Sequence, residues 1–86
     1  MIGGFAFSKA GHDKKVLYVI VEEREGIVYL CDGRYKTLEK PKKKNPKHIQ
    51  PIAQTIENSL LKKLQNGEKV TDEQIKYQIK WMQKPH

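Results

Sequence analysis

The stretch Val16-Leu-Tyr-Val-Ile-Val21 is the longest uninterrupted apolar run of the chain, and it decides the fold class. Successive side chains of a strand point to opposite faces, so every second side chain from Val16 lies on one face and every second one from Leu17 on the other. A strand that is apolar on both faces is buried on both sides. The run therefore predicts a small β-barrel, in which a bent central strand meets a different part of the core with each face.

Shorter apolar segments on either side of this run complete a predicted meander of four or five strands. Phe5-Ala-Phe7 precedes the run and Ile27-Val-Tyr-Leu30 follows it, and both are rich in β-branched or aromatic residues. The segment Glu22 to Gly26 supplies the turn between the central strand and the next one. Asp32-Gly33 follows, a dipeptide favoured in type I′ turns with positive φ at both residues, and it predicts a tight hairpin.

After Gln50 the apolar spacing changes from that of strands to that of helices. Pro51 suits the first position of a helix, and Gly67 suits its end. Between them an apolar stripe recurs at three- and four-residue spacing, formed by Ile52, Ala53, Ile56, Leu60 and Leu64. This pattern predicts a first helix that begins at Pro51.

A second helix is predicted from its start signal. Thr71 and Gln74 match a capping box, and Val70 and Ile75 match the hydrophobic staple that accompanies one. Ile79 and Met82 continue the apolar stripe, and Trp81 lies beside it. Pro85 ends the predicted helix. We expect Trp81 to pack beside the stripe. The predicted fold is mainly β with C-terminal α: a barrel over residues 1–50, then a helical hairpin over residues 51–86 that packs on the barrel or on a partner.

The charge of the chain favours a polyanionic partner. Its 86 residues contain 17 Lys and Arg against 10 Asp and Glu, which gives a net charge of +7. This length leaves room for one small domain with a helical appendage. Residues 1–50 carry 11 basic and 6 acidic residues, so most of the excess lies on the predicted barrel.

Cysteine use and hydropathy indicate a cytoplasmic protein without a membrane segment. The single cysteine, Cys31, cannot form an intrachain disulfide, which is typical of a reducing compartment. The six-residue run that ends at Val21 is far shorter than the roughly 18 residues of a membrane span. No export signal is expected.

Two segments of the predicted barrel concentrate basic side chains. The loop Ser8 to Lys15 surrounds a glycine that can bring the backbone close to a ligand. The segment Arg34 to His48 has seven Lys and Arg against one Glu in fifteen residues, and Pro41 and Pro46 favour an extended path. Phosphates would offset the repulsion within such a segment. The candidate RNA-binding residues are Lys9, Gly11, His12, Lys14, Lys15, Arg34, Tyr35, Lys36, Lys40, Lys42, Lys43, Lys44, Asn45, Lys47 and His48.

A solvated turn is the alternative for the first loop, and a solubilising loop is the alternative for the second. The presence of both segments favours RNA. The candidates for base readout, by stacking or by hydrogen bonds to base edges and 2′-hydroxyls, are Tyr35, His12, His48 and Asn45. Tyr18 and Tyr29 lie inside predicted strands and are expected to pack in the core or at its rim.

No catalytic constellation is predicted. His12 and Asp13 are adjacent and point apart, Ser8 lacks a GxSxG elbow, and Cys31 has no local nucleophile signature. The three histidines and the cysteine lack metal-ligand spacing, and the nucleotide-binding glycine motifs are absent. We expect neither an enzyme nor a protein with a metal or cofactor.

The glycine-centred loop between two hydrophobic strands, from Ile2-Gly-Gly-Phe through Ser8-Lys-Ala-Gly-His-Asp-Lys-Lys15 to Val21, resembles a KOW motif. Leu30-Cys-Asp-Gly-Arg34 and Leu38 to Ile49 resemble the matching segments of KOW-domain proteins related to eukaryotic and archaeal large-subunit ribosomal proteins, in particular their small bacterial relatives. The resemblance covers about residues 2–50. Family loops often carry a second glycine where this chain has Lys15.

This resemblance implies an SH3-like β-barrel and RNA binding, with Gly11 as the loop glycine and Lys9, His12, Lys14 and Lys15 as its basic positions. The expected function is therefore a non-catalytic RNA-binding protein, ribosomal or ribosome-associated, that binds rRNA or another structured RNA through its basic loops. The alternative is a protein-interaction module that docks a ribosomal or transcription factor partner. The C-terminal helices, with Trp81 and Met82, are the surface for such a partner.

Overall fold

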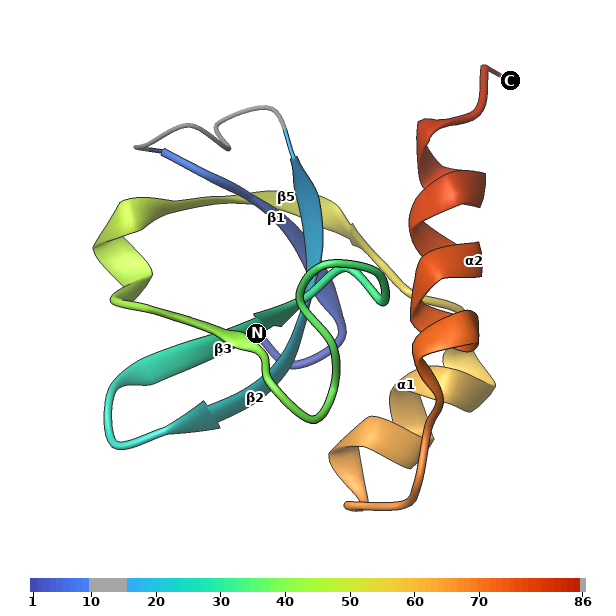
Figure 1. Cartoon of the computed structure of the whole chain (residues 1–86), viewed down its shortest axis with the longest axis horizontal. Coiled ribbons are helices and arrows are strands. Elements are labelled where there is room, and N and C mark those ends of the chain that lie inside the picture. Colours follow the sequence, from blue (N-terminus) through green and yellow to red (C-terminus); the bar gives the residue numbers. More distant parts are fainter. Residues whose placement is uncertain (10–15, 86) are drawn as a thin grey trace.

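The computed structural model describes residues 1–9 and 16–85, which form a five-stranded antiparallel sheet followed by two helices (Figure 1). In chain order the elements are β1 (Gly4–Ser8), β2 (Leu17–Arg24), β3 (Ile27–Cys31), β4 (Lys42–Lys44), the 3₁₀ helix η1 (Pro46–His48), β5 (Ile49–Thr55), α1 (Asn58–Gln65) and α2 (Asp72–Gln83). The strands lie in the order β4-β3-β2-β1-β5. The predicted class, mainly β with C-terminal α, is confirmed. None of the helices in the described ranges is long and apolar enough to cross a membrane.

The central strand β2 is buried on both faces, as its sequence predicts. Leu17 and Val19 belong to a core cluster that also contains Ile75 and Ile79 of α2. Tyr18 belongs to a second cluster on the opposite face of the sheet. Both helices lie on the same side of the sheet (Figure 1), so one face is covered by helices and the other by the curl of the sheet itself.

The curl of the sheet brings its two edges toward one another. Ile49 of β5 shares a buried cluster with Val28 and Leu30 of β3, although two strands, β2 and β1, lie between β3 and β5 in the sheet. The short helix η1 leads from β4 directly into β5. The sheet is nevertheless open, with β4 and β5 at its edges, so the predicted barrel is not closed by strand pairing in the described part of the chain.

The tight hairpin lies at a different turn from the one predicted. Arg24 pairs with Ile27, and the two residues between them, Glu25 and Gly26, have φ of 53° and 78°, as a type I′ turn requires. At Asp32-Gly33 only the glycine has a positive φ, of 76°. Residues 32–41 form a longer connection from β3 to β4, so the predicted hairpin at Asp32-Gly33 is wrong.

The predicted helix start at Pro51 is also wrong, because Pro51 pairs with Ala6 inside β5. A proline is tolerated there since β5 is an edge strand, where its missing N–H breaks no ladder on the open side. The helix begins at Asn58, after Glu57, whose carboxylate accepts a hydrogen bond from the backbone N–H of Leu60 at 2.9 Å. Strand β5 thus extends past residue 50, the expected boundary between the barrel and the helical hairpin.

The second helix begins as predicted. Thr71 Oγ1 accepts from the backbone N–H of Gln74 at 3.2 Å, and Gln74 Oε1 accepts from the backbone N–H of Thr71 at 2.9 Å, which completes the capping box. Ile75 and Ile79 are buried against the sheet. Trp81 is 53% exposed, so its predicted packing beside the stripe is wrong.

Candidate nucleic-acid interface

The triple lysine forms the edge strand β4, which confirms its predicted extended path. Lys42, Lys43 and Lys44 pair with Leu30, Tyr29 and Val28 of β3 in the antiparallel register. Lys43 is exposed, whereas Lys42 and Lys44 are half-buried. The backbone pairing holds the three ammonium groups on one fixed edge of the sheet.

Two tyrosine rings lie beneath these cations. Lys42 Nζ is 5.8 Å from the centroid of the Tyr18 ring, and Lys43 Nζ is 5.9 Å from that of Tyr29. Both rings are buried, which confirms their predicted packing role. Arg24 also covers Tyr29, with Cζ 5.0 Å from the centroid and Nη2 donating to the phenolic oxygen at 3.1 Å. That hydrogen bond, together with the Glu22 carboxylate, raises the pKa of Arg24.

The helix η1 turns the chain immediately after β4 and is capped by a predicted site residue. Asn45 Oδ1 accepts from the backbone N–H of Lys47 at 3.1 Å, and its carbonyl accepts from that of His48 at 2.9 Å. The side-chain oxygen of Asn45 therefore has a structural role, and its amide group is the donor that could meet a base. Lys47 and His48 are both exposed.

The fold brings the start of the first basic loop against the end of the second basic segment. The backbone N–H of Lys9 donates to the carbonyl oxygen of His48 at 2.9 Å. The neighbouring residues Ser8 and Ile49 are paired in the β1–β5 ladder. We define the β4–η1 patch as the described candidate residues of this edge strand, of η1 and of the contact between Lys9 and His48: Lys9, Lys42, Lys43, Lys44, Asn45, Lys47 and His48. The predicted residues Gly11, His12, Lys14 and Lys15 lie outside the described residues.

Four predicted residues belong to the connection from β3 to β4 instead. The Asp32 carboxylate accepts from the backbone N–H groups of Arg34 and Lys36, each at 2.8 Å, and shapes the first part of this connection. Lys40 donates its backbone N–H to the Thr37 carbonyl at 3.1 Å further along. Tyr35, beside Arg34, is 78% exposed. The predicted basic segment is thus divided between two places in the fold.

The first part of this connection is docked on the start of α2. A β-carbon added at Gly33 would overlap the carbonyl oxygen of Asp72 and lie 2.9 Å from the backbone nitrogen of Lys76. Asp72 Oδ1 accepts from the backbone N–H of Leu38 at 2.8 Å. The Asp-Gly pair that resembles a hairpin turn in sequence is therefore a helix-docking segment.

The Cys31 thiol contributes to the same junction. It is buried at the end of β3, and its Sγ donates to Asp72 Oδ1 at 3.7 Å. Burial, with a smaller contribution from the Asp72 carboxylate, raises the pKa of Cys31 to about 12. The thiol therefore keeps its proton at neutral pH and belongs to the packing of α2.

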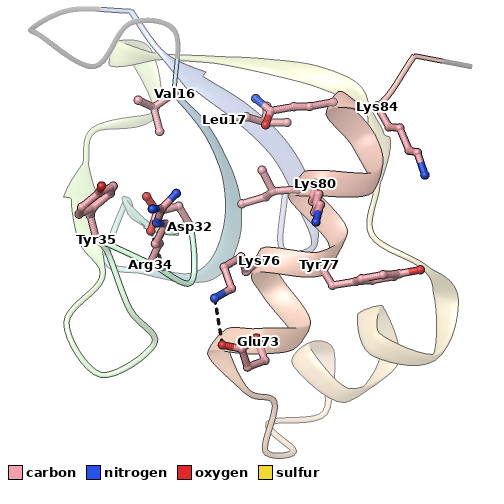
Figure 2. Close-up of a pocket in the computed structure, with 12 residues that line it drawn as sticks. Val16, Leu17, Asp32, Arg34, Tyr35, Glu73, Lys76, Tyr77, Lys80 and Lys84 are labelled. Atoms are coloured by element: carbon pink, nitrogen blue, oxygen red, sulfur yellow. Dashed lines mark hydrogen bonds and ion pairs between the residues drawn. The ribbon is translucent and has the colours of Figure 1, made fainter.

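Sequence reasoning missed a row of cations on α2. Lys76 and Lys80 are four residues apart, so they lie on one side of the helix, and Lys84 follows at its C-terminal cap. Together with Arg34 and Tyr35 they line a groove between α2 and the β3–β4 connection (Figure 2). The four-residue spacing of the lysines was the signal that could have identified this row.

Comparison of the chain with protein-family models and with curated proteins gives no match.

Proposed function

We propose that this chain is a non-catalytic RNA-binding protein of the cytoplasm, ribosomal or ribosome-associated, whose β4–η1 patch contacts the phosphate backbone of a structured RNA. The observation that carries the proposal is the Lys9–His48 backbone hydrogen bond of 2.9 Å. It joins two basic segments that are almost forty residues apart in sequence, and it places the start of the first beside the end of the second.

The charge of this surface supports a phosphate partner. Within the described ranges, Lys43, Lys44 and Lys47 form no ion pair, and the ion pairs there join other groups, such as Lys76 with Glu73. The cations lie on an edge strand and a capped turn, so their backbone is already ordered. The entropic cost of ordering this segment when a ligand binds is therefore small. Release of counterions from the RNA then supplies much of the binding free energy.

The shape of the sheet supports the finer part of the proposal, an SH3-like barrel of the KOW type. A four-stranded meander, β1 to β4, with β5 paired beside β1, a curl that packs Ile49 with Val28, and a 3₁₀ turn between β4 and β5 fit that architecture. The KOW resemblance of residues 2–50 implies the same fold and the same class of ligand. The loop that would carry the KOW glycine, Gly11, begins at the patch residue Lys9.

The test is RNA binding by two variants that change charge equally. A patch variant carries Lys43→Glu, Lys44→Glu and Lys47→Glu, and a control variant carries Lys62→Glu, Lys63→Glu and Lys69→Glu on and beyond α1, where all three lysines are exposed. We expect the patch variant to bind a folded rRNA fragment at least about tenfold more weakly than the control, because like charges in contact cost several kcal/mol. Equal binding by both variants would show that only net charge matters and would refute the proposal.

Ribosome association has a separate test. We expect the full-length chain to sediment with large ribosomal subunits of a native lysate, and to move to the top of the gradient after ribonuclease treatment. If capture by a partner survives both ribonuclease and the Lys43→Glu, Lys44→Glu, Lys47→Glu substitutions, a protein surface is recognised, and the protein-interaction alternative replaces RNA binding.

A further inference from the structure

The groove beside α2 has the composition of a site for an unpaired nucleic-acid strand. It has a volume of about 930 Å³ and is bounded by α2 on one side and by the β3–β4 connection on the other. Figure 2 shows Arg34 and Tyr35 on the connection, opposite Lys76 and Lys80 on the helix. We infer that this groove binds a single-stranded segment of the same RNA whose structured part contacts the β4–η1 patch, an inference that rests on the proposed function.

The described residues that line the groove carry a positive net charge, even though one of its lysines forms an ion pair within the groove. Of the two carboxylates among the described lining residues, Glu73 forms an ion pair with Lys76 at 3.0 Å, and Asp32 accepts two backbone N–H groups of its own connection. The remaining cations are Arg34, Lys80 and Lys84. With four cations against two carboxylates, the described lining residues carry a net charge of +2, which favours the phosphates of a strand.

The exposed aromatic rings favour RNA over an acidic peptide. Tyr35 is 78% exposed, and the Arg34 guanidinium lies over its ring, with Cζ 5.3 Å from the centroid. Tyr77, at the outer edge of the helix wall, is 64% exposed. An exposed ring beside cations, as Tyr35 is beside Arg34, is a feature that single-strand binding sites share, because every base can stack on such a ring. An acidic peptide would satisfy the cations and leave these ring faces unused.

The groove is held at a fixed width before any ligand binds. Gly33 touches the backbone of α2, and Asp72 Oδ1 holds the N–H of Leu38 at 2.8 Å, so the connection and the helix are fastened together at the start of α2. Val16, which is 36% exposed, adds an apolar surface to the lining of the groove, whereas Leu17 and Ile79 are buried in the core. Bases could rest on this lining while the phosphates meet the cations at the rim. Such preorganisation lowers the entropic cost of binding a flexible strand.

The experiment compares one RNA hairpin with and without a ten-nucleotide single-stranded tail, by fluorescence anisotropy with the full chain. We expect the tail to increase the affinity of the wild-type protein. The Lys80→Glu, Lys84→Glu variant should lose this increase and still bind the tailless hairpin as the wild type does. The matched control is Lys62→Glu, Lys63→Glu, which should keep the increase.

Two Tyr35 variants separate stacking from a merely structural effect. Tyr35→Ala should reduce the contribution of the tail by about five- to a hundredfold, the range for loss of one stacked base, whereas Tyr35→Phe should preserve it. An unchanged tail contribution in Lys80→Glu, Lys84→Glu would overturn the inference and leave the proposed function intact. The inference would also be overturned if the tail did not change the affinity of the wild-type protein and poly-glutamate bound in the groove instead. Failure of the wild type to bind even the tailless hairpin would refute the proposed function itself.

Discussion

The backbone N–H of Lys9 donates a hydrogen bond to the carbonyl oxygen of His48 at 2.9 Å, and this contact joins the two basic segments of the chain. It lies next to the Ser8–Ile49 pair of the β1–β5 ladder, so the same strand pairing that forms the sheet also sets the position of the cations. Because the bond is between backbone groups, substitutions of the Lys9 side chain change the charge of the patch without removing the contact.

A single substitution at Lys9 tests the β4–η1 patch with the smallest change of charge. Lys9→Glu should reduce the slope of log affinity against log salt concentration by about 0.7 to 0.9, since one phosphate contact is lost. Lys69→Glu, at another exposed lysine, before α2, should leave the slope unchanged. Both are measured by RNA titration at several salt concentrations. An equal loss of slope in the two variants would contradict a localised patch.

Gly33→Ala should destabilise the protein by about 2 to 4 kcal/mol in urea unfolding, because it combines a positive φ of 76° with overlap against the α2 backbone. Gly26→Ala is the matched control. Gly26 has a φ of 78°, yet a β-carbon there meets nothing within 4 Å, so about 1 kcal/mol is expected from the backbone alone. Equal costs at the two sites would show that the connection is not docked on α2.

Asp72→Ala should cost about 1 to 3 kcal/mol of unfolding free energy, because it leaves the half-buried N–H of Leu38 without its acceptor. Glu73→Ala, one residue further on, removes only an exposed ion pair with Lys76 and should change stability by less than about 0.5 kcal/mol. Urea unfolding of the two variants measures the difference. Indistinguishable midpoints would rule out the proposed role of Asp72 in holding the groove.

Because the pKa of Cys31 is raised, we expect the protein to lose stability at high pH. Its pKa is about 12 in the folded protein against 9.0 as the reference value, so above pH 9 the unfolded chain binds fewer protons than the folded one. The free energy of unfolding should fall by up to about 1.4 kcal/mol per pH unit between pH 9 and 12 from this group alone. Cys31→Ala should lack that component, which is the difference between the two stability curves. Parallel curves would contradict the buried, protonated thiol.

The parts of the fold that depend on local pattern could be predicted from the sequence. The two-faced apolar run at Val16 to Val21 identified the central strand, and the Thr71–Gln74 pair identified the start of α2, because both signals are complete within a few residues. The extended path of Lys42 to Lys44 followed from the bracketing prolines.

The errors arose where a distant partner decides the local structure. Pro51 begins no helix because β1 is available to pair with residues 49–55, and Asp32-Gly33 forms no hairpin because α2 docks against it. The same reason explains why the sequence pattern places Arg34 in one basic segment with Lys42 to Lys44. The contact of Gly33 with α2, which separates Arg34 from these lysines in the fold, leaves no local signal in the sequence. The cations of α2 were overlooked because they look like an ordinary solvated helix face until the connection opposite them is placed.

The most direct test of the central claim is the salt dependence of RNA binding by the wild-type chain and by the Lys43→Glu, Lys44→Glu, Lys47→Glu variant. If the five patch lysines each contact one phosphate, the wild-type log affinity should fall with log salt concentration at a slope of about −3.5 to −4.5. The variant keeps two of these lysines and should show a slope near −1.4 to −1.8. Binding that does not depend on salt, or an identical slope for both proteins, would contradict the account.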